Sequence, residues 1–255
     1  MIDLHCHILP GVDDGAKNME QSIAMAKLAV EEGITHILAT PHHQAHNWYN
    51  EKIKVQQLVE EVQAALDEEG IPLIIFPGQE VRLYGEIIAD IKADKIQFID
   101  EANQYLLIEF PSTSVPAYTE RLFYELQAIG ITPIVVHPER NQAIEKEPEI
   151  LKNLVDKGAL AQLTAGSYIG KFGREVEKLS KDLIEANLIH YIASDSHNTS
   201  NRKFHLKEAY EALEKDYGSE LVNRYQQTTK DLVNGDLIFP PATKKIKKKR
   251  FFGLF

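Results

Sequence analysis

Short apolar runs alternate with longer amphipathic segments along most of the chain. Seven runs rich in branched aliphatic residues predict buried strands at residues 1–7, 34–40, 72–80, 104–110, 131–137, 158–164 and 189–195. Apolar positions spaced three or four residues apart predict helices at residues 18–32, 50–69, 116–129, 144–157, 173–187, 201–216 and 218–233. Residues 85–99 predict a helix and a short irregular stretch inserted before the fourth strand.

The order of these elements predicts repeated strand–helix units. Strands separated by helical segments are typical of an α/β fold with a parallel sheet. Glycine follows several of the helical segments, where it favours the left-handed backbone that ends a helix: Gly33, Gly70, Gly130 and Gly158. We therefore expect one α/β domain over residues 1–240, followed by a basic and aromatic tail at residues 241–255.

Composition narrows the class of protein. The chain has 255 residues, is 44% hydrophobic, and contains one cysteine, Cys6. A single cysteine rules out an internal disulfide framework and fits a reducing compartment. The N-terminus lacks the basic and apolar segments of an export signal, and no apolar run approaches the roughly 18 residues that span a bilayer. We therefore expect a cytoplasmic protein.

The charge is unevenly distributed. The net charge is −10, and six of the 28 basic residues lie at 244–250, after all 38 acidic residues, so the first 243 residues carry −16. An acidic body argues against nucleic acid as a ligand, because such binding depends on Lys and Arg. The tail "KKIKKKRFFGLF" predicts either peripheral contact with an anionic membrane, at the inner face of the cell membrane, or a solvated disordered segment.

Imidazole and carboxylate groups collect at the predicted strand ends. In "DLHCHILPGVDDG", His5 and His7 are two residues apart and therefore share one face of a strand, as do Asp195 and His197 in "SDSH". The ends of the other strands carry similar groups: His42, Glu80, Glu109 and His137. In a parallel barrel, the carboxyl ends of the strands form one common active-site face.

Such a cluster requires cations. One histidine or glutamate at a strand end is ordinarily a solvated loop residue, but eight converging groups would repel one another or remain poorly solvated without metal ions. Asp14 in "GVDDG" could add a further carboxylate, with Asp13 as the alternative. A mixed nitrogen and oxygen ligand set suits manganese, iron, zinc or magnesium. About nine ligands are too many for one ion, and two or three ions indicate hydrolysis by a metal-activated hydroxide.

Two arginines indicate the substrate class. Arg140 follows His137 by three residues and Arg202 follows His197 by five, so both guanidinium groups could reach the same rim. Guanidinium groups match phosphate oxygens in shape and charge, although a surface ion pair fits the spacing equally well.

The remaining candidates are weaker. A thiol phosphatase needs C-x5-R, and Val12 occupies the arginine position relative to Cys6. Cys6 should face away from the two neighbouring histidines, as a small core residue. The role of His43, next to His42, is left open. Four other histidines are expected to be structural or exposed: His36, His46, His190 and His205.

Taken together and in order, the motifs "DLHCHILPGVDDG", "ATPHH", "GQEVR", "HPERN" and "SDSHN" resemble the polymerase and histidinol phosphatase (PHP) superfamily. More closely, they resemble the bacterial manganese-dependent protein-tyrosine phosphatases of capsule and exopolysaccharide operons, the CpsB/YwqE type. The resemblance covers residues 3 to about 202 and implies a distorted (β/α)7 barrel, similar to a TIM barrel, with three metal ions.

The resemblance also implies a ligand set. His5, His7, Glu80 and Asp195 would hold the first ion, Glu80, Glu109 and His137 the second, and Asp14, His42 and His197 the third. Arg140 and Arg202 would bind the phosphate.

The implied activity is phosphotyrosine hydrolysis by hydroxide attack without a covalent intermediate, on bacterial proteins such as tyrosine kinases that control polysaccharide synthesis. The sequence leaves three alternatives: a small-molecule phosphatase of the histidinol-phosphatase type, a phosphodiesterase, and a non-catalytic metal-bound scaffold.

Overall fold

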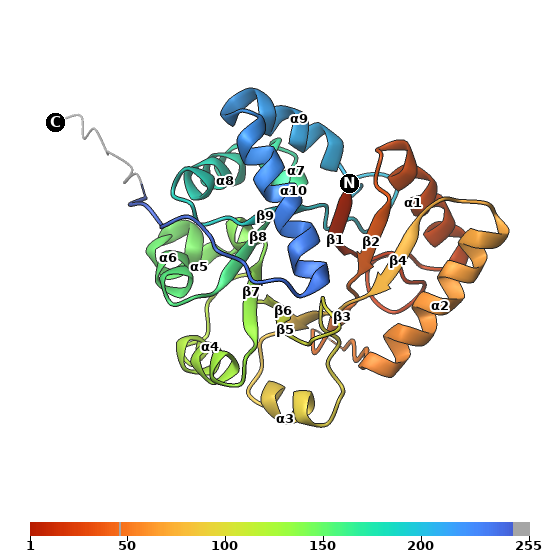
Figure 1. Ribbon diagram of the computed structural model, residues 1–255, viewed down its shortest axis with the longest axis horizontal. Coiled ribbons are helices and arrows are strands. Elements are labelled where there is room, and N and C mark those ends of the chain that lie inside the picture. The colour runs from red at the N-terminus through yellow and green to blue at the C-terminus, as the bar shows by residue number, and fades with distance from the viewer. Residues whose placement is uncertain (46, 247–255) are drawn as a thin grey trace.

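The computed structural model describes residues 1–45 and 47–246 (Figure 1). Its strands are β1 (Ile2–Cys6), β2 (His36–Ala39), β3 (His42–His43), β4 (Ile74–Pro77), β5 (Glu80–Arg82), β6 (Tyr105–Glu109), β7 (Thr132–Val136), β8 (Leu160–Thr164) and β9 (Tyr191–Ala193). Its helices are α1 (Met19–Glu31), α2 (Lys52–Glu68), α3 (Ile87–Lys92), α4 (Thr119–Ala128), α5 (Gln142–Lys146), α6 (Glu149–Asp156), α7 (Ala165–Tyr168), α8 (Arg174–Glu185), α9 (Leu206–Tyr217) and α10 (Ser219–Asn234), with a 3₁₀ turn, η1 (Pro138–Arg140).

The strands form a distorted parallel barrel of seven staves. One sheet has the order β1-β2-β4 and the other β3-β5-β6-β7-β8-β9. β3 follows β2 closely in the chain, and β5 follows β4 closely. Because β2 pairs with β4 and β3 pairs with β5, β2 and β3 together form one broken stave, and β4 and β5 form the next. Two backbone hydrogen bonds of 2.8 Å join the end of β1 to the residues after β9. The N–H of Asp195 donates to the carbonyl of His5, and the N–H of His7 donates to the carbonyl of Ser196. The expected (β/α)7 architecture is confirmed.

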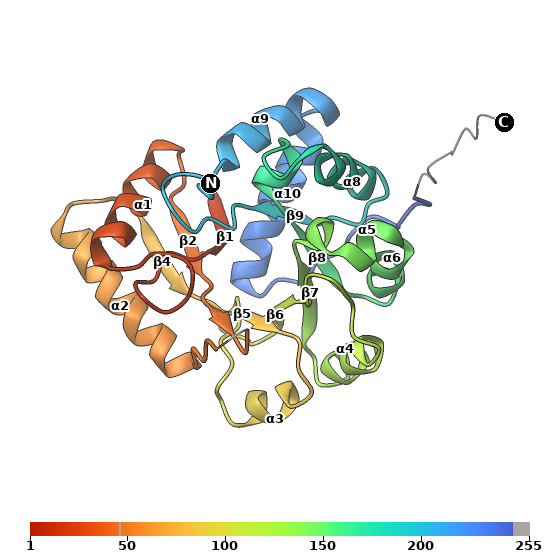
Figure 2. The same cartoon turned by 180° about the vertical axis from the view of Figure 1, so that it is seen from behind.

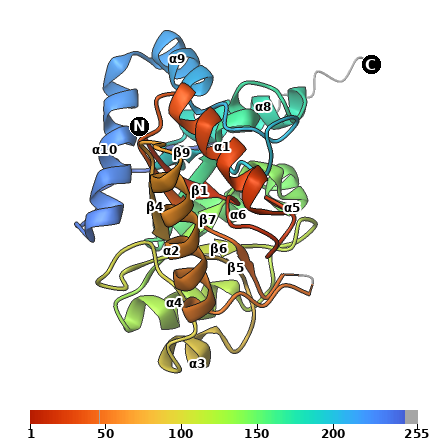
Figure 3. The ribbon, with the colours of Figure 1, turned by 90° about the vertical axis from the view of Figure 1, so that its right-hand side faces the viewer.

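Two apolar layers hold the barrel together. The inner layer fills the barrel and includes Leu4, Leu107, Ile134 and Tyr191, all at most 1% exposed. The outer layer lies between the strands and the surrounding helices, which Figure 2 shows from behind. α10 crosses the end of the barrel where the strands begin, and its Leu232 joins the inner layer (Figure 3). One end of the barrel is therefore closed by apolar packing, and polar groups meet at the other.

The predicted third strand, residues 72–80, is broken in the structure. It divides into β4 and β5 at Gly78, where a Cβ atom would lie 2.6 Å from Cγ of Leu38 on the neighbouring stave. Only glycine permits that approach, so the chain bends there and re-enters the barrel wall at Glu80. The adjacent Pro77 and Gly78 were the available signal of this break in the sequence.

The helices of the structure differ from the predicted ones in four places. Residues 144–157 form two helices, because Pro148 disfavours helical backbone at the preceding residue. The helix predicted from residue 201 begins at Leu206, and the short α7 and η1 were not predicted. The four glycines expected at helix ends all have left-handed backbone, with φ between 65° and 95°.

Two further expectations concern Cys6 and membrane segments. Cys6 is fully buried in the outer layer, as predicted. Among residues 1–45 and 47–246, no helix is long and apolar enough to cross a membrane.

A long-range cap joins α1 to α9. His205 precedes α9 with left-handed backbone and makes no side-chain cap. Instead, the carboxylate of Glu32, just after α1, accepts hydrogen bonds from the N–H groups of His205, Leu206 and Lys207 at 3.2, 2.9 and 3.3 Å. This contact fixes the start of α9 and hence the end of the loop that carries Arg202.

We expect Glu32→Ala to lower the free energy of unfolding by about 1–2 kcal/mol, the usual loss when a helix cap is removed. Glu31→Ala, which removes the same charge from an exposed neighbour, is the matched control. Urea denaturation of both variants measures the difference, and equal effects would contradict the capping role.

Candidate metal centre

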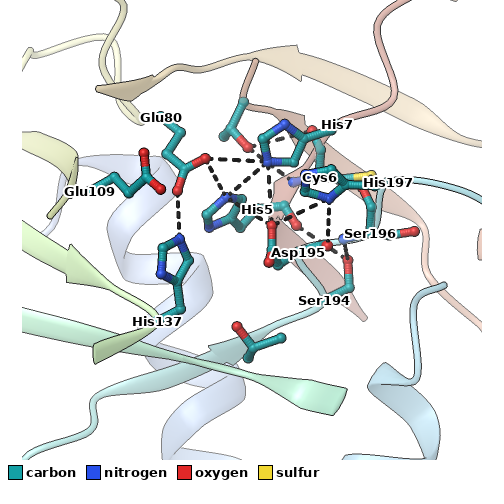
Figure 4. Close-up of polar contacts among 12 residues, drawn as sticks. His5, Cys6, His7, Glu80, Glu109, His137, Ser194, Asp195, Ser196 and His197 are labelled. Atoms are coloured by element: carbon teal, nitrogen blue, oxygen red, sulfur yellow. Dashed lines mark hydrogen bonds and ion pairs between the residues drawn. The ribbon is translucent and has the colours of Figure 1, made fainter. Parts of the chain in front are cut away.

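The carboxyl ends of the staves bring all nine predicted ligand residues together, and Figure 4 shows most of them. A bulge in β1 sets the directions of the His5 and His7 side chains. Between Asp3 and Cys6, β1 has one residue more than β2, which shifts the alternation of its side chains. Leu4 therefore packs in the inner layer, and His5 and His7 also point into the barrel, whereas Cys6 points outward.

The buried hydrogen bonds of His5 and His7 orient both rings. Nδ1 of His5 donates to Oε1 of Gln162 at 3.0 Å, and Nδ1 of His7 donates to Oδ2 of Asp13 at 2.8 Å. The two Nε2 atoms then face each other at 3.3 Å with their lone pairs pointing into the site. Two such lone pairs repel unless a proton or a cation lies between them. Outer hydrogen bonds of this kind are typical of metal-binding histidines.

Glu80 lies at the centre of the cluster. Its Oε2 is 3.4 Å from Nε2 of both His5 and His7, and its Oε1 is 2.6 Å from Nε2 of His137. Glu80 is fully buried, which raises the pKa of its carboxyl, but the charges of His42 and His5 and the hydrogen bond from His137 outweigh this and hold the pKa well below its usual value. Glu80 is therefore a carboxylate, and its position suits a bridge between two cations.

Asp195 completes the first group from the opposite wall. Its Oδ1 lies 3.4 Å from Nε2 of His5 and 3.3 Å from Nε2 of His7. Asp195 and His137 both adopt left-handed backbone, with φ of 54° and 36°. Such backbone costs on the order of 1 kcal/mol or more for a residue with a side chain. Strained backbone of this kind is common at functional sites.

A second group is formed by Asp14, His42 and His197. Oδ1 of Asp14 lies 3.4 Å from Nε2 of each histidine. Nδ1 of His197 donates to the carbonyl of Asp195 at 2.9 Å, so its Nε2 carries the lone pair. Burial lowers the pKa of His197 to about 4, with His7 acting in the same direction, which keeps the imidazole neutral as a metal ligand must be.

The structure separates the two aspartates of the "GVDDG" loop. Gly15 allows this loop to pack on the chain at His7, because a Cβ at Gly15 would collide with the carbonyl of His7. Asp13 turns outward from the cluster to hold the His7 ring, and it also accepts from the N–H of His42 at 3.1 Å. Asp14 points at the histidines instead.

Glu109 lies at the edge of the cluster. Its Oε2 is 3.8 Å from Nδ1 of His42 and 3.2 Å from Nε of Arg82, which fixes its position. Burial raises the pKa of the Glu109 carboxyl, and the neighbouring Glu80 raises it further, to about 7. A divalent cation between the two carboxylates would relieve this repulsion.

The donor atoms fit divalent cations. They form three overlapping groups within which the ligand atoms all lie within 4.8 Å of one another: His7, Asp14, His42 and His197; His5, His7 and Glu80; and His42, Glu80 and Glu109. Several buried ligand atoms lack a well-formed hydrogen bond, among them Oε2 of Glu80, Oε2 of Glu109 and Nε2 of His197. Buried polar atoms are rarely left in this state. Bound cations would satisfy them.

Both predicted arginines reach this rim. Arg140 and Arg202 each donate from Nη2 to Oδ2 of Asp195, and Nη1 of Arg202 lies 3.4 Å from Oδ2 of Asp14. Phe172 packs on the guanidinium of Arg140, with its ring centroid 5.2 Å from Cζ. The two guanidinium groups therefore face the open side of the cluster, where an anion would meet them.

A cavity of about 260 Å³ opens directly above these groups. It is lined by Asp14, His42, Trp48, Glu109, Phe110, Ser112, Val136, His137, Pro138, Arg140, Asn141, Asp195 and Arg202. Five of the nine predicted ligand residues and both predicted arginines thus border one small opening. The other four ligand residues do not line it.

The side chains that support the ligands were not predicted from the sequence. Gln162 is the one polar residue among the apolar neighbours of "ALAQL", and that contrast was the available signal. Trp48 and Arg82 had no spacing that marked them. Of the histidines set aside, His36 stacks on Phe76, His190 accepts from the N–H of Ala161, and His205 pairs with Glu208.

His43, which the sequence left open, is buried beside Tyr84, with the ring centroids 6.4 Å apart. His46 lies outside the described residues.

Comparison with known proteins places this geometry in a family. Residues 1–232 match the model of the family described as capsular polysaccharide synthesis, CpsB/CapC. The chain is 44% identical to the tyrosine-protein phosphatase YwqE of Bacillus subtilis and 42% identical to a Staphylococcus aureus protein named CapC, in each case over 255 residues and the full length of both chains. It is 27% identical to the tyrosine-protein phosphatase CpsB of Streptococcus pneumoniae, over 86% of this chain and 92% of that one.

Solved structures agree. A crystal structure from work on YwqE of Bacillus subtilis and CpsB of Streptococcus pneumoniae, described as metal-dependent tyrosine phosphatases, superposes with a TM-score of 0.94 at 44% identity, covering 97% of this chain and 100% of that one. An organophosphorus hydrolase variant from Deinococcus radiodurans shares the fold alone, with a TM-score of 0.55 at 12% identity over 91% of this chain and 92% of that one. The chain therefore belongs to the CpsB/CapC family of capsular polysaccharide synthesis proteins.

Proposed function

We propose that this protein is a metal-dependent protein-tyrosine phosphatase. The observation that carries the proposal is that nine residues with nitrogen or oxygen ligand atoms cluster at one end of the barrel, beside a small opening that two arginines also line. The tyrosine-protein phosphatases that are similar over the full chain support the same activity.

We assign the nine residues to three cation sites. His5, His7, Glu80 and Asp195 would hold one ion, and Glu80, Glu109 and His137 would hold a second, with Glu80 shared between the two sites. Asp14, His42 and His197 would hold a third. Manganese is the metal we propose, with iron, zinc or magnesium compatible with the ligand set. When bound, the ions supply an activated water as the nucleophile and neutralise charge on the phosphate.

The protein's own side chains bind and orient the substrate. Arg140 and Arg202 hold the phosphoryl oxygens from the open side and stabilise the charge that develops on them. The leaving tyrosinate has an ordinary pKa of about 10, so it departs with less help from a general acid than a serine alkoxide needs. Hydrolysis proceeds without a covalent enzyme intermediate.

The substrates we propose are phosphotyrosines on bacterial proteins, including the tyrosine kinases that control capsule and exopolysaccharide synthesis. The family's description, capsular polysaccharide synthesis, supports this setting. We place the enzyme in the cytoplasm as one phosphatase domain, residues 1–240, with a tail from residue 241 that contacts anionic membrane at its inner face. Residues 247–255 of this tail lie outside the described residues.

We expect Arg140→Ala to lower kcat/KM for a phosphotyrosine peptide by about 10²–10³-fold with metal content retained, because it removes a donor to the transition state. His5→Ala should lose metal as well as activity. The matched control is Arg121→Ala on the exposed side of α4, where Arg121 pairs with Glu125. Elemental analysis and steady-state kinetics measure both quantities, and full activity in either site variant would refute the assignment.

Metal removal should lower thermal stability. At a manganese concentration 100 times the dissociation constant, one site adds about 2.7 kcal/mol, which raises Tm by roughly 5–10 °C in a chain of this length. Calorimetry of chelated and reloaded protein measures the shift. His36→Ala, outside the cluster, should keep it, and His7→Ala should lose most of it. An identical shift in both variants would place the metal elsewhere.

Removal of residues 244–255 should abolish binding to vesicles that contain phosphatidylserine, since each basic residue near an anionic surface contributes up to about 1 kcal/mol. Sedimentation with vesicles of neutral lipid is the control. Turnover of a soluble phosphotyrosine peptide should not change. Unaltered vesicle binding after truncation would end the membrane proposal.

A further inference from the structure

The cavity above the metal centre is small and mostly charged at its base. Its volume of about 260 Å³ lies below the roughly 300–1,000 Å³ of pockets for drug-sized ligands, so it suits a single side chain. Arg140 and Arg202 occupy the side where a phosphate would lie. The group that carries the phosphate would then contact the remaining surface of the cavity.

Two aromatic residues line the cavity, and they differ in exposure. Phe110 is 5% exposed and stacks on Phe123, so it belongs to the core behind the wall. Trp48 is only half-buried. It therefore offers the larger aromatic surface to a ligand in this opening.

The position of Trp48 is well defined. Its backbone N–H donates to the carbonyl of Ala45 at 2.9 Å, and its backbone carbonyl accepts from the N–H of Gln44 at 3.0 Å. The indole is nearly parallel to the ring of His42, with an interplanar angle of 6° and centroids 5.2 Å apart. Parallel rings in contact at that centroid distance are offset rather than fully overlapped, so part of the indole remains uncovered.

We propose that Trp48 is a specificity-determining residue whose indole packs against the phenyl ring of phosphotyrosine while the phosphate lies at Arg140 and Arg202. The inference rests on the proposed function and adds the group that selects an aryl over an alkyl phosphate. Aromatic pairs contribute about two- to tenfold in affinity beyond the effect of buried area, and an alkyl ester such as phosphoserine forgoes this contact.

The chain itself supplies a probe, because Trp48 is its single tryptophan. We expect the intrinsic fluorescence of the manganese-loaded enzyme to change when a peptide with a non-hydrolysable phosphonate analogue of phosphotyrosine binds. Inorganic phosphate should compete with that peptide yet leave the emission almost unchanged. A phosphonate peptide that binds by calorimetry without altering the emission would overturn the proposal.

Substitution of Trp48 distinguishes two roles: contact of the indole with the substrate, and packing of the indole against His42 alone. Trp48→Leu should lower the ratio of kcat/KM for phosphotyrosine over phosphoserine peptides about tenfold, with metal content unchanged, and Trp48→Phe should restore most of the ratio. Tyr49→Leu is the matched control, since Tyr49 is the adjacent residue and is 62% exposed. An equal fall for both peptides, or loss of metal, would overturn the inference.

The outcomes distinguish this inference from the proposed function. A wild-type enzyme that hydrolyses phosphotyrosine with a ratio unaffected by Trp48→Leu keeps the function and rejects the role of Trp48. A wild-type enzyme that neither binds the phosphonate peptide nor hydrolyses phosphotyrosine rejects both.

Discussion

The burial of Glu80 and Asp195 among imidazoles at the open end of the barrel is the constraint on which the rest of the site depends. Removing carboxylates from water is costly unless opposite charges compensate. Both carboxylates face ring nitrogens of His5 and His7 at 3.3–3.4 Å, and the other nitrogens of these two rings already bond to Gln162 and Asp13. With cations bound, the same arrangement satisfies carboxylates and lone pairs together.

The fold supplies this arrangement through departures from regular strands. The bulge in β1 turns His5 inward after Leu4, and the break at Gly78 lets the third stave re-enter the wall with Glu80 aimed at the cluster. His137 and Asp195 hold left-handed backbone where β7 and β9 end. The apolar packing of α10 closes the opposite end, so the polar groups are confined to one mouth.

The sequence predicted much of this because the ligands sit on elements with simple periods. His5 with His7, and Asp195 with His197, are paired by the two-residue period of a strand, and the parallel barrel brings the strand ends together. The choice between Asp13 and Asp14 could not be made locally, since both carboxylates occupy one loop and only tertiary contacts decide which faces the histidines.

Other features depend on contacts between distant parts of the chain. The cap of α9 by Glu32 joins residues more than 170 positions apart, so the sequence placed the start of that helix too early. Gln162 and Trp48 act through neighbours that only the fold supplies.

The most direct test of the account is turnover by metal-stripped enzyme of a phosphotyrosine peptide, a phosphoserine peptide and histidinol phosphate, each with and without added manganese. The account predicts manganese-dependent hydrolysis confined largely to phosphotyrosine. Preference for histidinol phosphate would contradict the assignment to protein phosphotyrosine, and turnover independent of metal would contradict the role of the cluster itself.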